Sequence, residues 1–132
     1  MTKIKISAVA AGLLALSFSL PAGATAEIGN YSFLRNTPAE RFSDEDWMLF
    51  KASLKASLDE GKTGETKTWD NEKTDASGEV TLVKSQAGKD KNCRRVRVTN
   101  RVKDRKRTSE ATFCLQDDGQ WKLRLRKHRK KQ

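Results

Sequence analysis

Two cysteines and one histidine, Cys93, Cys114 and His128, are the residues of this chain with the widest choice of chemistry. Four-coordinate metal sites need more ligands than these three residues supply at these spacings, so we expect no metal and no other cofactor. In an oxidising compartment, an even pair of cysteines is typical of a structural disulfide. A Cys93–Cys114 bond would close a loop of about 20 residues and contribute about 3 kcal/mol to stability.

No arrangement of side chains typical of catalysis is found in the sequence. His128 lies among the cations of the C-terminal tail, where no neighbour would position it as a general base. Asp117 and Asp118 precede Gly119, and this pattern is typical of a tight turn rather than of paired catalytic carboxylates. A phosphate-binding glycine loop is also missing. We therefore predict a protein that is not an enzyme.

Cationic side chains are concentrated in the C-terminal part of the chain. Residues 91–132 hold 16 Lys plus Arg against 4 Asp plus Glu, whereas residues 27–90 hold 9 against 13. Guanidinium groups donate hydrogen bonds in a planar fork that suits phosphate and carboxylate oxygens. The candidate polyanion-binding residues, expected to form one continuous basic surface, are Arg94, Arg95, Arg97, Arg101, Lys103, Arg105, Lys106, Arg107, Arg124, Arg126, Lys127, Arg129, Lys130 and Lys131.

The N-terminus has the pattern of a secretory signal peptide. Lys3 and Lys5 precede an apolar run over residues 8–20, and the small residues at 24–26 form a typical cleavage site. A run of about 13 apolar residues is too short to span a bilayer comfortably. We expect cleavage before Glu27, no membrane span in the mature chain, and an exported protein that is periplasmic, on the cell surface or secreted.

Outside the cytoplasmic membrane, the anionic partners for these cations are lipopolysaccharide, anionic lipid head groups, acidic polysaccharides and acidic proteins. Nucleic acid is expected only where it is extracellular, although Trp121 beside Lys122 and Arg124 has the composition of a base-stacking platform. The alternative for Trp121 is a place in the core beneath a helix. The charge also has an alternative explanation, a solvated face that confers solubility without a specific ligand.

Two strands are expected to position the cysteines and the arginines. From Cys93 onward, valines alternate with arginines, and residues 108–115 alternate in the same way, which is typical of strands with one buried face. An antiparallel register that places Cys93 opposite Cys114 also places Val96 opposite Ala111 and Arg97 opposite Glu110. Both faces agree with this register. It predicts a disulfide on the polar face of a hairpin whose other face packs on the core.

One amphipathic helix is expected before the strands. Ser43 precedes three acidic residues at 44–46, which is typical of a helix N-terminus, and Phe42 can pack on Trp47 as a hydrophobic staple. Gly61 is placed where a left-handed C-terminal cap is expected. The apolar residues that recur at helical spacing, and that we assign to the core, are Trp47, Phe50, Leu54 and Leu58.

The remaining segments predict an α+β fold in which one N-terminal helix packs on a small four- to five-stranded antiparallel sheet. Further strands are expected at 65–69, at 79–84 and from Trp121 through Leu123 to Leu125. Residues 75–78, 85–92 and 117–119 have turn composition, and a basic connection is expected over 100–107. The expected organisation is a signal peptide at 1–26, an irregular lead-in at 27–42 with a helical turn begun at Thr37-Pro38, a domain at 43–125 and a basic tail at 126–132.

The order of these landmarks resembles the C-terminal domain of the 17 kDa surface antigen family of Gram-negative bacteria, from about Phe42 to Leu123. The resemblance implies a helix on a small antiparallel sheet, an envelope location and no catalytic residues. Members often carry a lipoprotein cysteine and a Gly-rich segment, which are lacking here, and Leu115 and Glu72 replace an expected arginine and proline. The matching residues are Ser43-Asp44-Glu45-Asp46, Gly64, Trp69, Asn71, Gly78, Val80-Thr81, Cys93-Arg94, Cys114 and Asp118-Gly119-Gln120-Trp121.

Two functions are compatible with these features. We predict an exported, non-enzymatic module of the cell envelope that binds an anionic envelope component through its C-terminal basic surface. The alternative is an accessory or inhibitor protein that docks on a periplasmic or secreted protein through the helix and the sheet edge. In that case affinity would respond to substitutions on the exposed helix face, such as Lys51 or Lys55, more than to salt.

Overall fold

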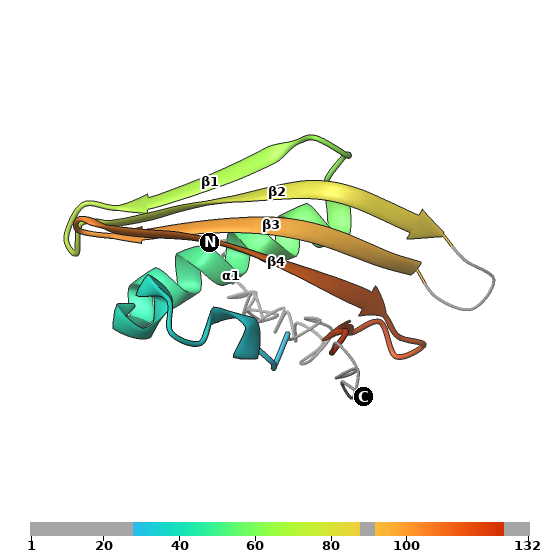
Figure 1. Ribbon diagram of the computed structural model, residues 1–132. Helices are drawn as coiled ribbons and strands as arrows, with labels where there is room; N and C mark the ends of the chain where they lie inside the picture. The colour runs from blue at the N-terminus through green and yellow to red at the C-terminus, as the bar shows by residue number, and fades with distance from the viewer. Residues whose placement is uncertain (1–27, 88–91, 126–132) are drawn as a thin grey trace, which may run out of the picture.

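The computed structural model describes residues 28–87 and 92–125 and has the α+β fold expected from the sequence. One helix lies across one face of a five-stranded antiparallel sheet (Figure 1). The predicted signal peptide and basic tail lie outside the described residues. Within those residues, no helix is both long enough and apolar enough to cross a membrane. The elements are the 3₁₀ helices η1 (Ser32–Leu34) and η2 (Pro38–Arg41), the α-helix α1 (Asp44–Glu60), and the strands β1 (Thr66–Asn71), β2 (Ala76–Ala87), β3 (Asn92–Val102), β4 (Arg105–Leu115) and β5 (Trp121–Leu123).

Helix α1 begins as its sequence predicts. The Ser43 side chain accepts a hydrogen bond from the Asp46 N–H at 3.1 Å, and the Asp46 carboxylate accepts one from the Ser43 N–H at 3.0 Å. These two bonds form a capping box that satisfies backbone donors left unpaired at the helix start. The rings of Phe42 and Trp47 pack edge to face with centroids 5.3 Å apart, so the predicted staple is confirmed.

The end of α1 differs from the prediction. Gly61 is not left-handed, because its φ of −66° and ψ of 146° are those of an extended residue. Its N–H donates to the Ser57 carbonyl oxygen at 3.1 Å, and a Cβ added to Gly61 would lie 2.3 Å from that same oxygen. Glycine is therefore needed here for a close approach of two backbone segments rather than for a positive φ.

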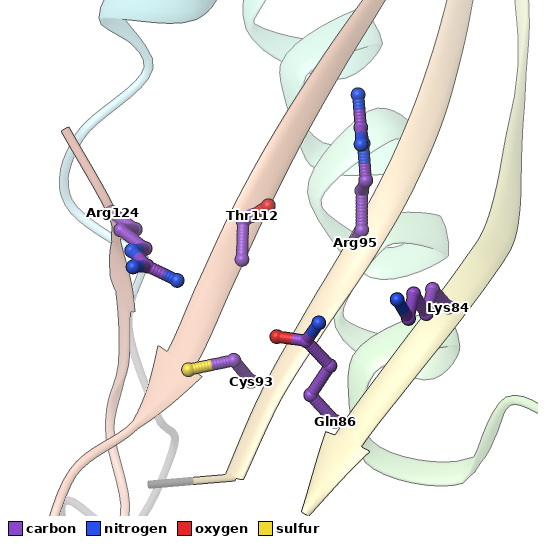
Figure 2. Close-up of a pocket in the computed structure, with 6 residues that line it drawn as sticks. All are labelled: Lys84, Gln86, Cys93, Arg95, Thr112 and Arg124. Carbon is purple, nitrogen blue, oxygen red and sulfur yellow. The ribbon is translucent and has the colours of Figure 1, made fainter. Parts of the chain in front are cut away.

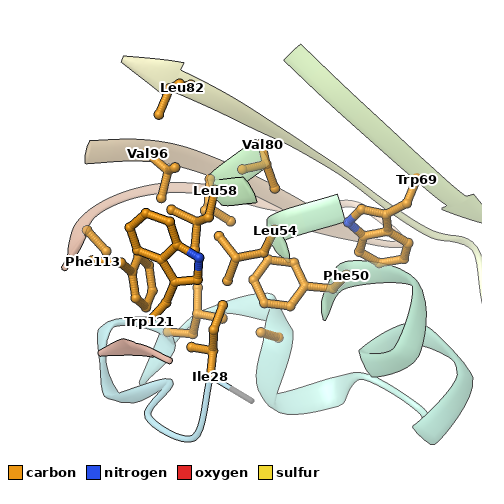
Figure 3. Close-up of a cluster of buried hydrophobic side chains, with 14 of the residues drawn as sticks. Ile28, Phe50, Leu54, Leu58, Trp69, Val80, Leu82, Val96, Phe113 and Trp121 are labelled. Atoms are coloured by element: carbon orange, nitrogen blue, oxygen red, sulfur yellow. The ribbon is translucent and has the colours of Figure 1, made fainter. Parts of the chain in front are cut away.

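The core lies between α1 and the sheet (Figure 3). The helix contributes Phe50, Leu54 and Leu58, which are completely buried, as their spacing predicted. Burial of apolar surface stabilises the folded state by roughly 25 cal/mol per Å², so the apolar contact between α1 and the sheet is the main source of stability. The most deeply buried apolar residues of the sheet are Val80, Leu82, Val96, Val98 and Phe113.

Trp121 belongs to this core and not to the surface. Its side chain is only 4% exposed, and its Nε1–H donates to Asp59 Oδ1 at 2.8 Å. The indole therefore joins β5 to the last turn of α1. A buried ring cannot offer its face to a nucleobase, so the stacking-platform interpretation was wrong and the core interpretation is confirmed.

The lead-in before α1 closes one side of the core. The helical turn expected at Thr37-Pro38 is present as η2, and the Thr37 hydroxyl accepts a hydrogen bond from the Ala39 N–H at 3.3 Å. Pro38 is favoured at the first helical position because its missing N–H would have no partner there. Leu34 and Ala39 are buried against the main core, so this segment packs as part of the fold.

The register predicted for the cysteine hairpin is confirmed. Cys93 pairs with Cys114, Val96 with Ala111, and Arg97 with Glu110. The predicted basic connection over 100–107 was wrong, because β3 continues to Val102 and β4 begins at Arg105. Asn100 and Val102 are buried and keep the core-facing parity of β3, so the strand pairing extends almost to the tip of the hairpin.

The outer strands also differ from their predicted limits. Strand β2 covers residues 76–87 and not 79–84, because the turn-like residues 76–78 pair with both β1 and β3. Strand β1 extends to Asn71, whose side chain is buried. Strand β5 ends at Leu123, and Leu125, expected to continue it, is exposed. The tight turn expected at 117–119 is present, with Gly119 at a φ of 81°.

Candidate functional site

The face of the sheet opposite α1, called the outer face here, carries several of the candidate cations. No described element covers it (Figure 1). Side chains that are directly paired across antiparallel strands lie on the same face and form rows across the sheet. One such row contains Thr81, Arg97 and Glu110, and the next contains Lys84, Arg95 and Thr112.

The disulfide lies on this outer face, as the hairpin pattern predicted. Cys93 and Cys114 are bonded, with Cα atoms 4.0 Å apart. Although they are on the polar side of the sheet, the two residues are only 7% and 5% exposed. The bond therefore has the surroundings of a structural cross-link, joining β3 to β4 near the open end of the hairpin.

Glu110 places a carboxylate between two arginines in the middle of the outer face. Its carboxylate forms an ion pair with Arg95 and accepts hydrogen bonds from Arg97 Nε and Nη2, both at 3.2 Å. The hydrogen bond from Arg95, more than that from Arg97, lowers the pKa of Glu110 below its ordinary value. These two guanidinium groups already hold a carboxylate, so they are poor candidates for binding a second anion.

Arg94 is directed to the other side of the sheet. Its Nη1 donates to the carbonyl oxygens of Ser57 at 3.3 Å and Gly61 at 3.1 Å. These carbonyls belong to the C-terminal turn of α1, where a cation offsets the negative end of the helix dipole. Arg94 therefore stabilises the contact between helix and sheet, and it does not join the predicted basic surface.

Arg101 connects two neighbouring turns. Its guanidinium donates to Asp75 Oδ1 at 3.1 Å, to the Lys103 carbonyl oxygen at 2.6 Å and to Ser77 Oγ at 3.2 Å. The Lys103 N–H also donates to the Asp75 carbonyl oxygen at 2.9 Å. The tip of the β3–β4 hairpin is thus tied to the turn between β1 and β2.

Three cations at this tip, Lys103, Arg105 and Lys106, are called the hairpin-tip cluster here. All three are exposed, and in the described part of the chain none has a carboxylate within ion-pair distance. Arg107, next to them, donates to the Asn36 carbonyl oxygen at 3.1 Å. Lys103 has a φ of 55°, a conformation that side chains rarely adopt. Its backbone is held by the hydrogen bonds of its N–H to Asp75 and of its carbonyl oxygen to Arg101.

A second group of cations surrounds a hollow at the opposite end of the outer face. This pocket has a volume of about 200 Å³ (Figure 2). Figure 2 shows the Lys84 and Arg124 side chains on opposite sides of it, with Cys93 and Thr112 on the strands between them. The residues that line the pocket are Lys84, Gln86, Cys93, Arg95, Thr112 and Arg124.

Lys84 was missed because the candidates were taken from the basic C-terminal part, and a β-bulge brings this lysine to the outer face. In β2 the even-numbered residues Val80 and Leu82 face the core, and simple alternation would place Lys84 beside them. The register shifts between Leu82 and Lys84, so that Lys84 pairs with Arg95 on the outer face. The only signal in the sequence is a lysine at an apolar position of the alternation.

The structure therefore divides the predicted continuous surface into separate parts. The hairpin-tip cluster and the pocket lie at opposite ends of β3, separated by the pairs of Glu110 with Arg95 and Arg97. The candidates at 126–131 lie outside the described residues. Among residues 28–87 and 92–125, no group of three or more His, Cys, Asp or Glu could hold a metal ion.

The chain matches the model of a known protein family. A family model for the 17 kDa outer membrane surface antigen matches residues 56–122, which is half of the chain. The matched region extends from the second half of α1 to the start of β5 and includes both cysteines. No curated protein and no solved structure matches the chain.

Proposed function

Because the chain belongs to the 17 kDa outer membrane surface antigen family, we propose that it is an exported envelope protein that binds an anionic envelope component. Binding takes place through the hairpin-tip cluster at one end of the sheet and through Lys84 and Arg124 at the other end, and the protein acts without catalysis. The family supports an exported or surface location. The anionic ligand carries phosphate or carboxylate groups, as lipopolysaccharide, anionic lipids and acidic polysaccharides do.

The observation that carries this proposal is the distribution of paired and unpaired cations. Arg95 and Arg97 share Glu110 as their ion-pair partner, Arg101 is paired with Asp75, and the positions of all three are explained by the fold. By contrast, the hairpin-tip cluster has no carboxylate partner among the described residues, although Glu79 and Asp70 lie on the same sheet. Because the backbone of this turn is held by hydrogen bonds, only the side chains of these cations have to be ordered when they bind an anion.

Sedimentation with vesicles and with purified lipopolysaccharide tests the proposal. The exported protein should bind lipopolysaccharide or phosphatidylglycerol vesicles at low salt and should not bind phosphatidylcholine vesicles. Binding should be lost at high salt, because the Debye length falls from about 30 Å at 0.01 M to about 3 Å at 1 M. The two anionic probes separate a glycolipid ligand from a general attraction to anionic membranes.

Matched charge variants complete the test. The triple variant Lys103→Gln, Arg105→Gln, Lys106→Gln should weaken binding strongly, and removal of residues 126–132 should weaken it further. The control Arg35→Gln, Arg41→Gln, Lys62→Gln removes the same charge from exposed residues outside the sheet and should have a small effect. Equal losses in the two triple variants would contradict a defined basic site.

Docking on a specific protein partner remains the competing function. Lys51, one of the helix residues expected to contribute to it, lies 5.4 Å from the Tyr31 ring centroid and 5.8 Å from that of Trp47. This contact gives Lys51 a place in the fold and weakens its case as an interface residue. Retention of a single protein at high salt, unaffected by the hairpin-tip variant, would favour docking over anion binding.

A further inference from the structure

We infer that the pocket over the disulfide is a site for a sugar phosphate, bound through the phosphate monoester with the sugar in the hollow beside it. This inference rests on the proposed function, since it names the anionic group that one end of the outer face recognises. The pocket residues are those given above: Lys84, Gln86, Cys93, Arg95, Thr112 and Arg124 (Figure 2).

The shape of the pocket follows from the sizes of the residues in two neighbouring rows. Arg124 continues the row of Lys84, Arg95 and Thr112, because its N–H donates to the Thr112 carbonyl oxygen at 2.8 Å. Long side chains at both ends of this row enclose the short side chain of Thr112 and the neighbouring disulfide. The β-bulge before Lys84 is what brings that lysine to the outer face and closes one side.

The charge of the pocket matches a phosphate monoester better than a carboxylate. Lys84 and Arg124 reach it from opposite sides, and neither has a carboxylate partner within the described residues. Arg95 contributes its aliphatic stem to the wall, while its guanidinium is held by Glu110. Two unpaired positive charges suit the charge of about −2 on a phosphate monoester at neutral pH. A sugar carboxylate would leave one of them unmatched.

Polar and apolar groups in the pocket suit the sugar itself. The Gln86 amide and the Thr112 hydroxyl have no hydrogen-bond partner in the described part of the structure, so both are available for sugar hydroxyls. The Cys93 sulfur and the Arg95 stem offer apolar surface to the C–H face of a ring. The volume of about 200 Å³ lies below the roughly 300 Å³ at which drug-sized sites begin, which limits the ligand assigned to this pocket to about one sugar unit.

Titration of the isotope-labelled exported protein, followed by NMR amide shifts, tests this inference. The probe is glucose 1-phosphate, with glucuronate, inorganic phosphate and glucose as comparisons. Glucose 1-phosphate should bind more tightly than any of the three, and its shifts should centre on residues 84–86, 93–95, 112 and 124. Lys84→Gln and Arg124→Gln should each weaken binding about tenfold, as expected for loss of a charged hydrogen bond. Lys55→Gln should leave the affinity unchanged.

Three results would overturn the sugar-phosphate assignment. They are glucuronate binding as tightly as glucose 1-phosphate, inorganic phosphate binding as tightly as glucose 1-phosphate, or both pocket variants binding glucose 1-phosphate with unchanged affinity.

The hairpin-tip triple variant separates this inference from the proposed function. Sugar-phosphate binding without any binding to lipopolysaccharide or anionic vesicles would remove the proposed function and leave the pocket. Salt-dependent vesicle binding that depends on the hairpin tip, without sugar-phosphate binding, would remove only the pocket assignment.

Discussion

Asn71 donates from its side-chain Nδ2 to Asp46 Oδ1 at 2.8 Å, and this buried hydrogen bond ties the end of β1 to the first turn of α1. The same carboxylate accepts from the Thr74 hydroxyl at 2.7 Å and from the Ser43 N–H at 3.0 Å. Asp46 therefore combines two tasks, capping its own helix and holding the strand and turn that pack against it.

Stability should depend on pH through Asp46. Burial raises the pKa of this carboxyl, but hydrogen bonds from Ser43, Thr74 and Asn71 together outweigh burial and lower it below its ordinary value. A carboxyl whose pKa is lower in the folded state stabilises the fold at pH values above its unfolded pKa, about 3.9. That contribution is lost as pH falls below this value and the carboxylate is protonated.

Urea denaturation between pH 6 and pH 2 should therefore show a decrease of stability below about pH 4. Asp46→Asn should be less stable than the unmodified protein by about 2 kcal/mol at neutral pH. Its loss of stability between neutral pH and pH 2 should be smaller than that of the unmodified protein. Asp44→Asn, an exposed residue of the same helical turn, is the control and should keep the decrease of the unmodified protein. If the stability of Asp46→Asn changes with pH in parallel with that of the unmodified protein, Asp46 is not the source of the pH dependence.

Gly78 should tolerate no side chain. A Cβ at this position would lie 2.3 Å from Trp69 Nε1 and 2.6 Å from Asn100 Oδ1, two buried groups packed on either side of it. Gly78→Ala should lower the free energy of unfolding by about 3 kcal/mol, measured by urea denaturation. Gly29→Ala, where an added Cβ has nothing within 4 Å, should change it little. Similar losses in both variants would mean that the clash is relieved by small shifts.

Arg94 and Arg97, which lie on opposite faces of β3, should behave differently when replaced. Arg94→Gln removes two hydrogen bonds to the carbonyls at the end of α1 and should cost about 1 to 2 kcal/mol of stability. Arg97→Gln removes an exposed partner of Glu110 and should cost less than about 1 kcal/mol. Vesicle binding should be preserved in Arg94→Gln. A loss of binding without a loss of stability would place Arg94 in the binding surface.

Replacement of Lys103 by glycine should raise the stability of the fold and weaken anion binding. Its φ of 55° is unfavourable for a side chain, so Lys103→Gly should stabilise the fold by up to about 1 kcal/mol in thermal or urea unfolding. Lys106→Gly, within β4, should instead destabilise it by about 1 kcal/mol. Both variants should weaken binding to anionic vesicles. If Lys103→Gly is as destabilising as Lys106→Gly, the strain attributed to this turn is absent.

Local chemistry was sufficient to predict much of this fold. Ser43 and the acidic residues after it mark the helix start because they satisfy backbone donors close in sequence. The alternation around Val96 and Ala111, together with the cysteine pair, determined the β3–β4 register, since a shift by one residue would have turned both apolar faces outward. The net charge of the C-terminal part also follows from the sequence alone, and the prediction of an anionic ligand rests on it.

The sequence by itself thus determined the helix, the hairpin register, the disulfide and the basic character of the surface. Only the tertiary structure decided which cations are available: Glu110 holds Arg95 and Arg97, Arg94 reaches the end of α1, and the bulge before Lys84 turns that lysine to the outer face. The physical reason is the separation along the chain of the residues that interact. Caps and alternation depend on near neighbours, whereas the pairing of a charge depends on residues that the fold brings together from distant parts of the chain.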